Sequence, residues 1–268
     1  MRSSSVFRAR APAFILALAA LLGTASCTTL AAPPAPATTD TSDPAEGFRA
    51  WVADFSKDAL KAGISRATID ATLGKARWLA QVIELDGAQP EFVRPVWQYL
   101  DSAVSTQRIV AGKTLRQINA KAMDDAAGRY GVPTGIITAI WGVESNYGTH
   151  FGNFRTIDAL ATLAYDGRRR EWARSELMAA LTIVDKGYMP AGSLIGSWAG
   201  AMGHTQFLPS VYLKYAVDAD GDGRRDIWGS TADVVASTAN FLAQSCWRPS
   251  EPWCGEVRLP ASFDCRHA

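Results

Sequence analysis

Apolar side chains recur every three or four residues along much of this chain, which is the period of an amphipathic α-helix. On this basis helices are predicted at residues 48–63, 64–75, 115–130, 170–186 and 230–242. Residues 79–89 are predicted to be irregular, and Trp97 and Tyr99 beyond them are expected to pack inward. The alternation typical of β-strands is almost absent. The pattern therefore predicts a mainly α fold, a helical bundle around a cleft with few or no strands.

One more predicted helix, at residues 133–147, carries an acidic side chain on its apolar face. Ile137, Ile140 and Trp141 share that face with Glu144, because they precede it by seven, four and three residues. Burial raises the pKa of a carboxyl group, and a carboxyl that keeps its proton near neutral pH can act as a general acid. A structural glutamate paired with an arginine fits the same spacing equally well. Glu144 is therefore a candidate catalytic acid, with a structural ion pair as the alternative.

Three segments resemble the motifs of a known enzyme family. Glu144 begins the run Glu-Ser-Asn-Tyr-Gly, which resembles the Glu-Ser-x-x-Gly motif of lysozyme-like lytic transglycosylases. Residues 200–210 (Gly-Ala-Met-Gly-His-Thr-Gln-Phe-Leu-Pro-Ser) resemble that family's Gly-x-Met-Gly-x-x-Gln-Phe-x-Pro-Ser segment. Residues 153–166 are similar to the membrane-bound lytic murein transglycosylase B family in particular. The resemblance follows the family's order from about residue 48 to about residue 260.

The resemblance implies a lysozyme-like α+β fold and an enzyme that cleaves peptidoglycan between N-acetylmuramic acid and N-acetylglucosamine. Glu144 would protonate the oxygen of this β-1,4 bond and then take the proton of the C6 hydroxyl, which closes onto C1 to give a 1,6-anhydromuramyl product. One carboxyl suffices, because the acetamido group of the substrate assists the reaction. Asp158 and Asp166 are acids nearby in the sequence, and we interpret both as structural. This chemistry requires no cofactor.

The same resemblance implies that several residues contact the glycan strand. Gln206 matches a glutamine that can bond the acetamido group, and Met202 with Gly203 would let the chain pass close to the sugar. Tyr212 would line a wall of the cleft, with core packing as an equal alternative. Phe241 stands where relatives commonly carry tyrosine. The expected substrate-binding residues are Ser145, Asn146, Met202, Gly203, Gln206, Tyr212 and Phe241.

Residues 218–229 resemble an EF-hand calcium loop. Acids occupy its positions 1, 3, 5 and 9, glycine occupies position 6, and position 7 contributes only a backbone carbonyl. Gly229 occupies position 12, where a bidentate acid is usual, although Asp233 lies one turn further on. Weak calcium binding and an acidic turn that binds no ion both fit. The expected ligands are Asp218, Asp220, Asp222, Arg224 through its carbonyl, and Asp226.

Residues 1–27 have the features of an export signal. A basic start precedes an apolar run, residues 11–22, that is too short to span a bilayer. Cys27 ends a Thr-Ala-Ser-Cys sequence that resembles a lipobox, so lipidation is expected, with cleavage at an ordinary site as the alternative. Residues 28–45, rich in Pro, Ala and Thr, are predicted to be a disordered tether. These features predict a periplasmic protein held by a lipid anchor at the outer membrane.

Composition and length limit the possible partners and the domain organisation. The 268 residues include 27 basic and 26 acidic side chains, so the chain has no general attraction to nucleic acid. We expect a small helical subdomain at residues 46–100, a catalytic core at residues 101–268, and a monomer. Cys246 and Cys254 could form a disulfide in an oxidising compartment, and no cysteine or histidine pattern indicates zinc.

Two alternatives to a lytic transglycosylase stay open. Relatives continue beyond the point that matches Phe263, so the core is expected to be shortened at its C-terminus. Such a chain could be a catalytically inactive module that binds peptidoglycan. The other alternative, a muramidase that uses water, needs a second carboxylate, and no spacing in the sequence places one opposite Glu144.

Overall fold

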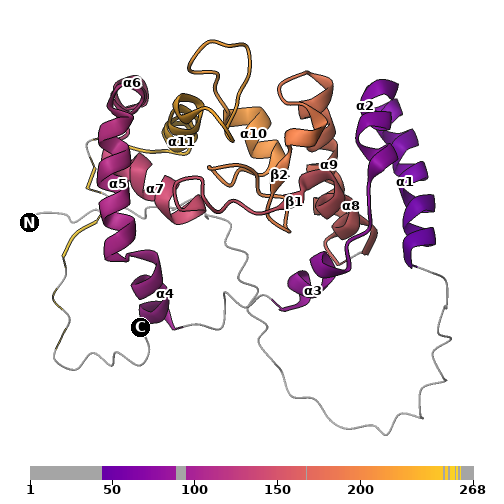
Figure 1. Ribbon diagram of the computed structural model, residues 1–268, viewed down its shortest axis with the longest axis horizontal. Helices are drawn as coiled ribbons and strands as arrows, with labels where there is room; N and C mark the ends of the chain where they lie inside the picture. The colour runs from indigo at the N-terminus through magenta and orange to yellow at the C-terminus, as the bar shows by residue number, and fades with distance from the viewer. Residues whose placement is uncertain are drawn as a thin grey trace, which may run out of the picture. The chain divides into compact units, whose positions relative to one another are not determined.

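The computed structural model describes residues 44–88, 95–166, 168–249, 251–252, 254–256, 258 and 260 (Figure 1). The predicted export signal, Cys27 and all of the predicted tether except Pro44 and Ala45 lie outside these residues. Those two residues already belong to the first helix. Within the described part of the chain, no helix is both long and apolar enough to cross a membrane.

Helices make up most of the described chain, which confirms the predicted mainly α fold. The α-helices are α1 (Pro44–Lys61), α2 (Arg66–Ala71), α3 (Ala80–Ala88), α4 (Val96–Ala103), α5 (Thr106–Ile118), α6 (Ala120–Tyr130), α7 (Thr134–Ser145), α8 (Thr156–Asp166), α9 (Arg170–Asp185), α10 (Pro209–Tyr215) and α11 (Thr231–Gln244). The short elements are the 3-10 turns η1 (Leu73–Lys75) and η3 (Ala191–Ser193) and the strands β1 (Phe154–Arg155) and β2 (Ile195–Gly196). The two strands pair antiparallel.

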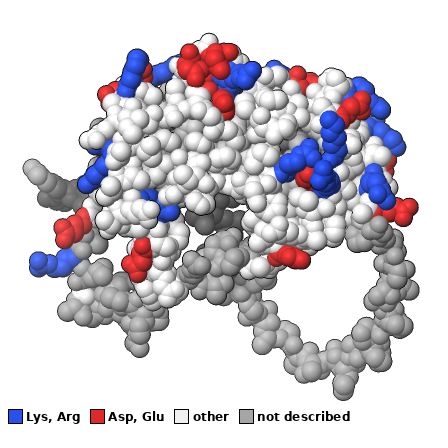
Figure 2. All heavy atoms as spheres, in the orientation of Figure 1, with Lys and Arg blue, Asp and Glu red and all other residues white. Residues whose placement is uncertain are grey.

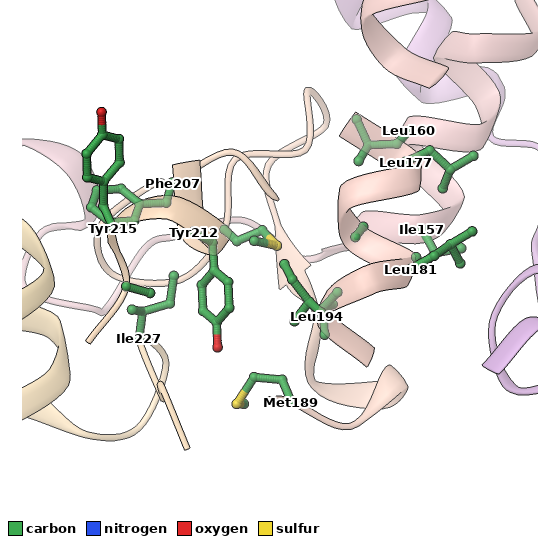
Figure 3. Packing of buried hydrophobic residues seen from close by; sticks show 14 of the residues in the cluster. Ile157, Leu160, Leu177, Leu181, Met189, Leu194, Phe207, Tyr212, Tyr215 and Ile227 are labelled. Carbon is green, nitrogen blue, oxygen red and sulfur yellow. The ribbon is translucent and has the colours of Figure 1, made fainter. Parts of the chain in front are cut away.

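The core forms around α8, in which every residue from Thr156 to Ala164 is buried. A helix that is buried on all sides must lie inside the fold. Figure 3 shows Ile157 and Leu160 of α8 beside Leu177 and Leu181 of α9. The helices α1 and α3 also pack against α8, while α2 and α10 pack against α9.

A further group of helices positions the acidic side chain of α7. Helix α11 packs against α6 and α7, and α5 packs against the same two helices. Phe55 of α1, Trp141 of α7 and Val234 of α11 belong to one cluster of buried side chains. By their contacts, the described residues from Pro44 onward belong to one compact unit. The boundary predicted near residue 100 stays a prediction.

The helix predicted at residues 115–130 is divided between α5 and α6, because Asn119 leaves the helical conformation. Two further local predictions are wrong. Residues 80–88, predicted to be irregular, form α3, because the fully buried Val82 packs with side chains of α8. Trp97 and Tyr99, predicted to pack inward, are 59% and 52% exposed, because α4 buries only Ala103. In both places contacts with distant segments decide the outcome, and the local pattern does not report them.

Asp86 anchors α3 through an ion pair with the turn before α9. Its carboxylate is 4% exposed and lies 2.6 Å from Nε of Arg168 and 3.1 Å from Nε of Arg169. Arg168 also donates a hydrogen bond to the backbone carbonyl of Asp86. The buried charge is therefore compensated by two cations.

We predict that Asp86→Ala lowers the free energy of unfolding by about 2–4 kcal/mol, because it removes the acid that both arginines bind. Urea unfolding measures the change. Asp54→Ala is the matched control, because Asp54 pairs with Lys57 on the open surface of α1, where both side chains are more than two-thirds exposed. Equal, small effects of the two substitutions would contradict the anchoring role.

Candidate active site

Glu144 lies in the last turn of α7, beside a hollow of about 580 Å³ between α7 and α5. One side of this hollow comes from α5 and the residue before it, and the other from the end of α7 and the turn that follows. The described lining residues are Ser105, Gln107, Arg108, Ala111, Val143, Glu144, Asn146 and His150. Glu144 is the only carboxylate among these lining residues.

The Glu144 side chain is exposed, not buried on the apolar face as predicted. Ile137 and Trp141 do face the core, but α7 ends one residue after Glu144, so the acid reaches the hollow. The protein around the carboxyl still removes part of its water, and this burial raises the pKa of Glu144 above the ordinary value. Within the described residues no hydrogen bond or ion pair holds the carboxylate. The structural ion pair is therefore not observed.

Asp158 is a structural acid, as interpreted from the sequence. Its side chain is 4% exposed and lies 3.2 Å from Nη1 of Arg155. Burial raises the pKa of Asp158, and the charge of Arg155 and a hydrogen bond from the backbone of Arg77 oppose that rise. Asp166 ends α8 and does not line the hollow.

Helix α7 ends at Ser145 because the next two residues leave the helical conformation. Asn146 and Tyr147 have φ angles of 47° and 60°, in the left-handed region. Nε of Arg108 donates to Oδ1 of Asn146 at 3.3 Å, and Nδ2 of Asn146 donates to Oγ1 of Thr149 at 2.8 Å. Asn146 thus lines the hollow and stays a predicted substrate contact.

Ser145 joins the two motifs on which the family resemblance depends. Its Oγ donates to the backbone carbonyl of His204 at 2.8 Å and accepts from the backbone N–H of Gly148 at 3.0 Å. At Gly148 a Cβ atom would lie 2.1 Å from the His204 ring, and φ is +83°, so glycine is required there. Because Ser145 is 1% exposed, its predicted substrate contact is not observed, and its hydroxyl holds the protein together.

Met202 and Gly203 are likewise buried rather than open to a sugar. The backbone N–H and carbonyl of Met202 bond with Phe207 at 2.8 and 3.2 Å, which closes a tight turn beside β2. A Cβ atom on Gly203 would lie 2.6 Å from the carbonyl oxygen of Ile227. The close approach that Gly203 permits is therefore to the protein's own chain.

Three more predicted contacts, like Ser145, Met202 and Gly203, lie outside the described lining of the Glu144 hollow. Gln206 is half-buried, and its Nε2 donates to the carbonyls of Phe151 and Gly203 at 3.1 and 3.0 Å. Tyr212 is fully buried and donates its hydroxyl to the carbonyl of Arg225 at 2.8 Å, so core packing is the arrangement observed. Phe241 packs against the rings of Phe207 and Tyr215, with centroid distances of 5.5 and 5.2 Å.

Sequence reasoning missed the wall that α5 contributes. Ser105 caps this helix by accepting from the backbone N–H of Arg108, and Nη1 of Arg108 donates to the carbonyl of Ala103 at 2.6 Å. The Ser-x-x-Arg spacing marks a helix start. It does not reveal that this helix turns Gln107 and Arg108 toward Glu144.

The acidic loop brings three of its predicted ligands together. One carboxylate oxygen each from Asp218, Asp220 and Asp222 lies within 4.8 Å of the others. Figure 2 shows acidic side chains gathered over the loop between α10 and α11. Such a set of hard oxygen donors suits calcium. The Arg224 side chain is exposed, as expected if only its carbonyl takes part.

Asp226 and Asp233 hold this loop by hydrogen bonds. Oδ1 of Asp226 accepts from the backbone N–H groups of Trp228 and Gly229 at 2.9 and 2.8 Å. The two carboxylate oxygens of Asp233 accept from the backbone N–H groups of Ala219 and Asp226 at 2.7 and 2.6 Å. The predicted ligand Asp226 is therefore occupied within the loop and does not join the three-carboxylate cluster.

Cys246 and Cys254 are both exposed, and within the described part of the chain both are free cysteines. The predicted bond is therefore not observed. Cys246 follows the end of α11 with a φ of 72°.

Comparison with known proteins defines the class. The chain matches the model described as Transglycosylase SLT domain over residues 47–268. It is 34% identical over 203 residues to Membrane-bound lytic murein transglycosylase B of Escherichia coli (strain K12), a match that covers 72% of this chain and 56% of that protein. The fold is similar to SltB3 from Pseudomonas aeruginosa in complex with NAG-NAM-pentapeptide, with a TM-score of 0.78 and 49% identity over 81% of this chain and 58% of that one. It is also similar to the Escherichia coli lytic transglycosylase Slt35 in complex with calcium, with a TM-score of 0.68 and 31% identity over 78% of this chain and 65% of that one.

These matches place the helical fold among the lysozyme-like lytic transglycosylases. The chain belongs to the transglycosylase SLT domain family. The predicted family and the predicted lysozyme-like fold are thereby confirmed. The chain spans little more than half the length of SltB3 and of the Escherichia coli transglycosylase B.

His204 should make stability depend on pH. Nε1 of Trp141 donates to Nδ1 of His204 at 3.2 Å, which requires a neutral ring, and burial lowers the pKa of His204 below its ordinary value. An unfolded histidine takes up a proton near pH 6.5. This contribution to stability is therefore full above about pH 6.5 and is lost as the pH falls through the lower pKa of the folded state.

Urea unfolding of the wild type and His204→Gln at pH 8 and pH 5 measures this effect. The stability difference between the two proteins should shrink at pH 5, since both share the same acidic groups. A difference that grows on acidification would contradict a neutral buried His204.

Proposed function

We propose that this protein is a lytic transglycosylase that cleaves the β-1,4 bond between N-acetylmuramic acid and N-acetylglucosamine in peptidoglycan. One observation carries the proposal. Glu144 has a pKa raised by burial and no bonded partner among the described residues, and it lines an open hollow. Membership of the transglycosylase family supports the same activity.

In the proposed reaction Glu144 acts first as an acid and then as a base. Its proton passes to the glycosidic oxygen between the two sugars, and the bond from that oxygen to C1 of N-acetylmuramic acid breaks. The acetamido oxygen of the same sugar stabilises C1, so no enzyme nucleophile is needed. The Glu144 carboxylate then takes the proton of the C6 hydroxyl, and the C6 oxygen bonds to C1. The product is a 1,6-anhydro sugar, the carboxyl regains its proton, and water is not consumed.

The lining of the hollow favours this route over hydrolysis. Ordinary glycosidases place a second carboxylate about 5–9.5 Å from the acid. The described lining offers Arg108 and His150 as its charged or titratable groups besides Glu144, and no second acid. A water-using muramidase is therefore the weaker candidate.

Glycan strands are the proposed partner. Solved structures of SltB3 hold NAG-NAM-pentapeptide and NAG-anhNAM-pentapeptide. The second ligand carries an anhydro sugar, the kind of product proposed here. We also propose a monomer in the periplasm, anchored at the outer membrane through Cys27, in keeping with the membrane-bound name of the Escherichia coli relative. Nucleic acid is not a proposed partner, since basic and acidic side chains nearly balance.

We predict that Glu144→Gln lowers the release of soluble muropeptides from peptidoglycan sacculi at least about 100-fold, because the amide has no proton to transfer. Mass spectrometry of the wild-type products should find fragments one water lighter than hydrolytic ones. Glu171→Gln is the matched control, because Glu171 is an exposed acid in the first turn of α9. Near-normal release by Glu144→Gln would remove Glu144 as the acid, and reducing-end muramic acid as the main product would indicate a muramidase. A wild-type chain that binds sacculi and releases nothing would indicate an inactive module.

The acidic loop is proposed to bind calcium weakly as a structural ion. Asp218, Asp220 and Asp222 would hold it, and the ion takes no part in the reaction. Because Gly229 removes the bidentate acid, we expect a Kd no tighter than about 10⁻⁴ M.

Calcium at ten times its Kd should stabilise the fold by about 1.4 kcal/mol, which raises the Tm modestly. Asp222→Ala should abolish that increment, and Asp54→Ala on α1 should leave it intact. An unchanged Tm of the wild type in up to about 10 mM calcium would show that the loop is only a turn.

A further inference from the structure

Tyr147, three residues after Glu144, has an unusual backbone conformation. Its φ of 60° follows the φ of 47° at Asn146, which places two successive non-glycine residues in the left-handed region. A bulky aromatic residue is uncommon there, because its Cβ crowds the backbone. Contacts of the side chain must therefore hold Tyr147 in place.

The ring of Tyr147 occupies a slot that two glycines leave open, one on α5 and one on α7. A Cβ atom on Gly112 of α5 would lie 2.3 Å from the tyrosine oxygen and 3.0 Å from Cζ. A Cβ atom on Gly142 of α7 would lie 2.6 Å from the oxygen, 2.7 Å from Cζ and 2.9 Å from Cε1. Any larger residue at either position would overlap the ring.

The Tyr147 side chain contacts both helices and so connects them. The Tyr147 hydroxyl donates to the backbone carbonyl of Arg108 on α5 at 2.9 Å. On the α7 side, the ring meets Trp141 edge to face, with centroids 5.6 Å apart. Since α5 and α7 are also the two walls of the Glu144 hollow, this contact joins those walls, although Tyr147 itself lines a neighbouring hollow between the same two helices.

We propose that Tyr147, seated between Gly112 and Gly142, is a positioning residue that sets the separation of α5 and α7 and so the depth of Glu144 in its hollow. The proposal rests on the proposed function, because the depth of Glu144 affects turnover only if Glu144 is the acid.

The separation of the walls determines how much water reaches the carboxyl. The charged or titratable groups that line the hollow with Glu144 are Arg108 of α5 and His150 of the turn. Wider walls would hydrate the carboxyl and let its raised pKa fall toward the ordinary value. The acid would then lose its proton at a lower pH, so the alkaline limb of the kcat profile would move to lower pH.

Gly112→Ala and Gly142→Ala test the slot from its two sides. We expect kcat at pH 7 to fall about tenfold or more, with KM changed less than about threefold and the alkaline limb shifted to lower pH. Gly128→Ala is the matched control, because Gly128 lies within α6 and a Cβ there meets no atom within 4 Å. It should retain wild-type kcat and the wild-type pH profile.

Tyr147→Phe gives a sharper test, because it deletes only the oxygen. In Gly112→Ala the nearest ring atom would then be Cζ at 3.0 Å, so the double variant should recover part of the lost kcat and stability. In Gly142→Ala two ring carbons would still lie within 2.9 Å, so Tyr147→Phe should recover neither. Thermal unfolding of the single and double variants measures this coupling without reference to activity.

If Tyr147→Phe restores stability equally in Gly112→Ala and Gly142→Ala, the proposed slot is overturned. Wild-type pH profiles in all the variants would overturn the positioning role, provided that Glu144→Gln, measured alongside, is inactive. If Glu144→Gln is active, the assignment of the acid fails instead. Where an alanine variant does not fold, Tyr147→Phe is tested alone. It keeps the ring but loses the hydrogen bond to the carbonyl of Arg108 on α5, so an alkaline limb shifted to lower pH supports the positioning role and a wild-type pH profile overturns it.

Discussion

The position of the Glu144 acid depends on one buried hydroxyl. Ser145 is its immediate neighbour, and the Ser145 Oγ bonds at once to the chain at Gly148 and at His204. It thereby fixes the end of α7 to the loop at residues 200–208, which is itself paired with β2. Because neighbouring backbone holds the acid, its carboxylate needs no partner of its own. The absence of a partner suits the proposed role of Glu144, since a bonded cation would favour the ionised carboxylate and work against a general acid.

Among the described residues, three carboxyl groups have a pKa raised by burial, yet they differ in their partners. Asp158 lies beside Arg155, and Asp233 accepts two backbone hydrogen bonds, so each of these acids is satisfied within the fold. Glu144 receives no such bond within the described residues. Burial raises the pKa of all three groups, so a raised pKa alone does not identify a catalytic acid. The combination of a raised pKa, an open hollow and no donor sets Glu144 apart.

Helical periodicity predicted the fold class and the inward faces of α1, α7, α9 and α11, because these follow from spacing alone. The exposure of Glu144 could not be predicted, because it depends on where α7 ends relative to α5. The motifs predicted that Ser145, Met202 and Tyr212 contact the substrate, but all three are buried in the structure. A motif records that a residue type is needed and leaves open whether it meets the ligand or the protein. The contribution of Arg108 comes from a distant helix, whose orientation only tertiary packing determines.

The two oxygens of Asp233 clamp the acidic loop at Ala219 and at Asp226, near its beginning and its end. The loop is thus already closed by the protein itself, and an arriving cation would have little left to organise. Binding would cost little ordering entropy and would move few atoms, so it would send no conformational signal to α10 or α11. In sensor proteins the ion drives a rearrangement of the flanking helices. Here Asp233 already fixes the acidic loop, so the calcium concentration would change the stability of the fold rather than the activity.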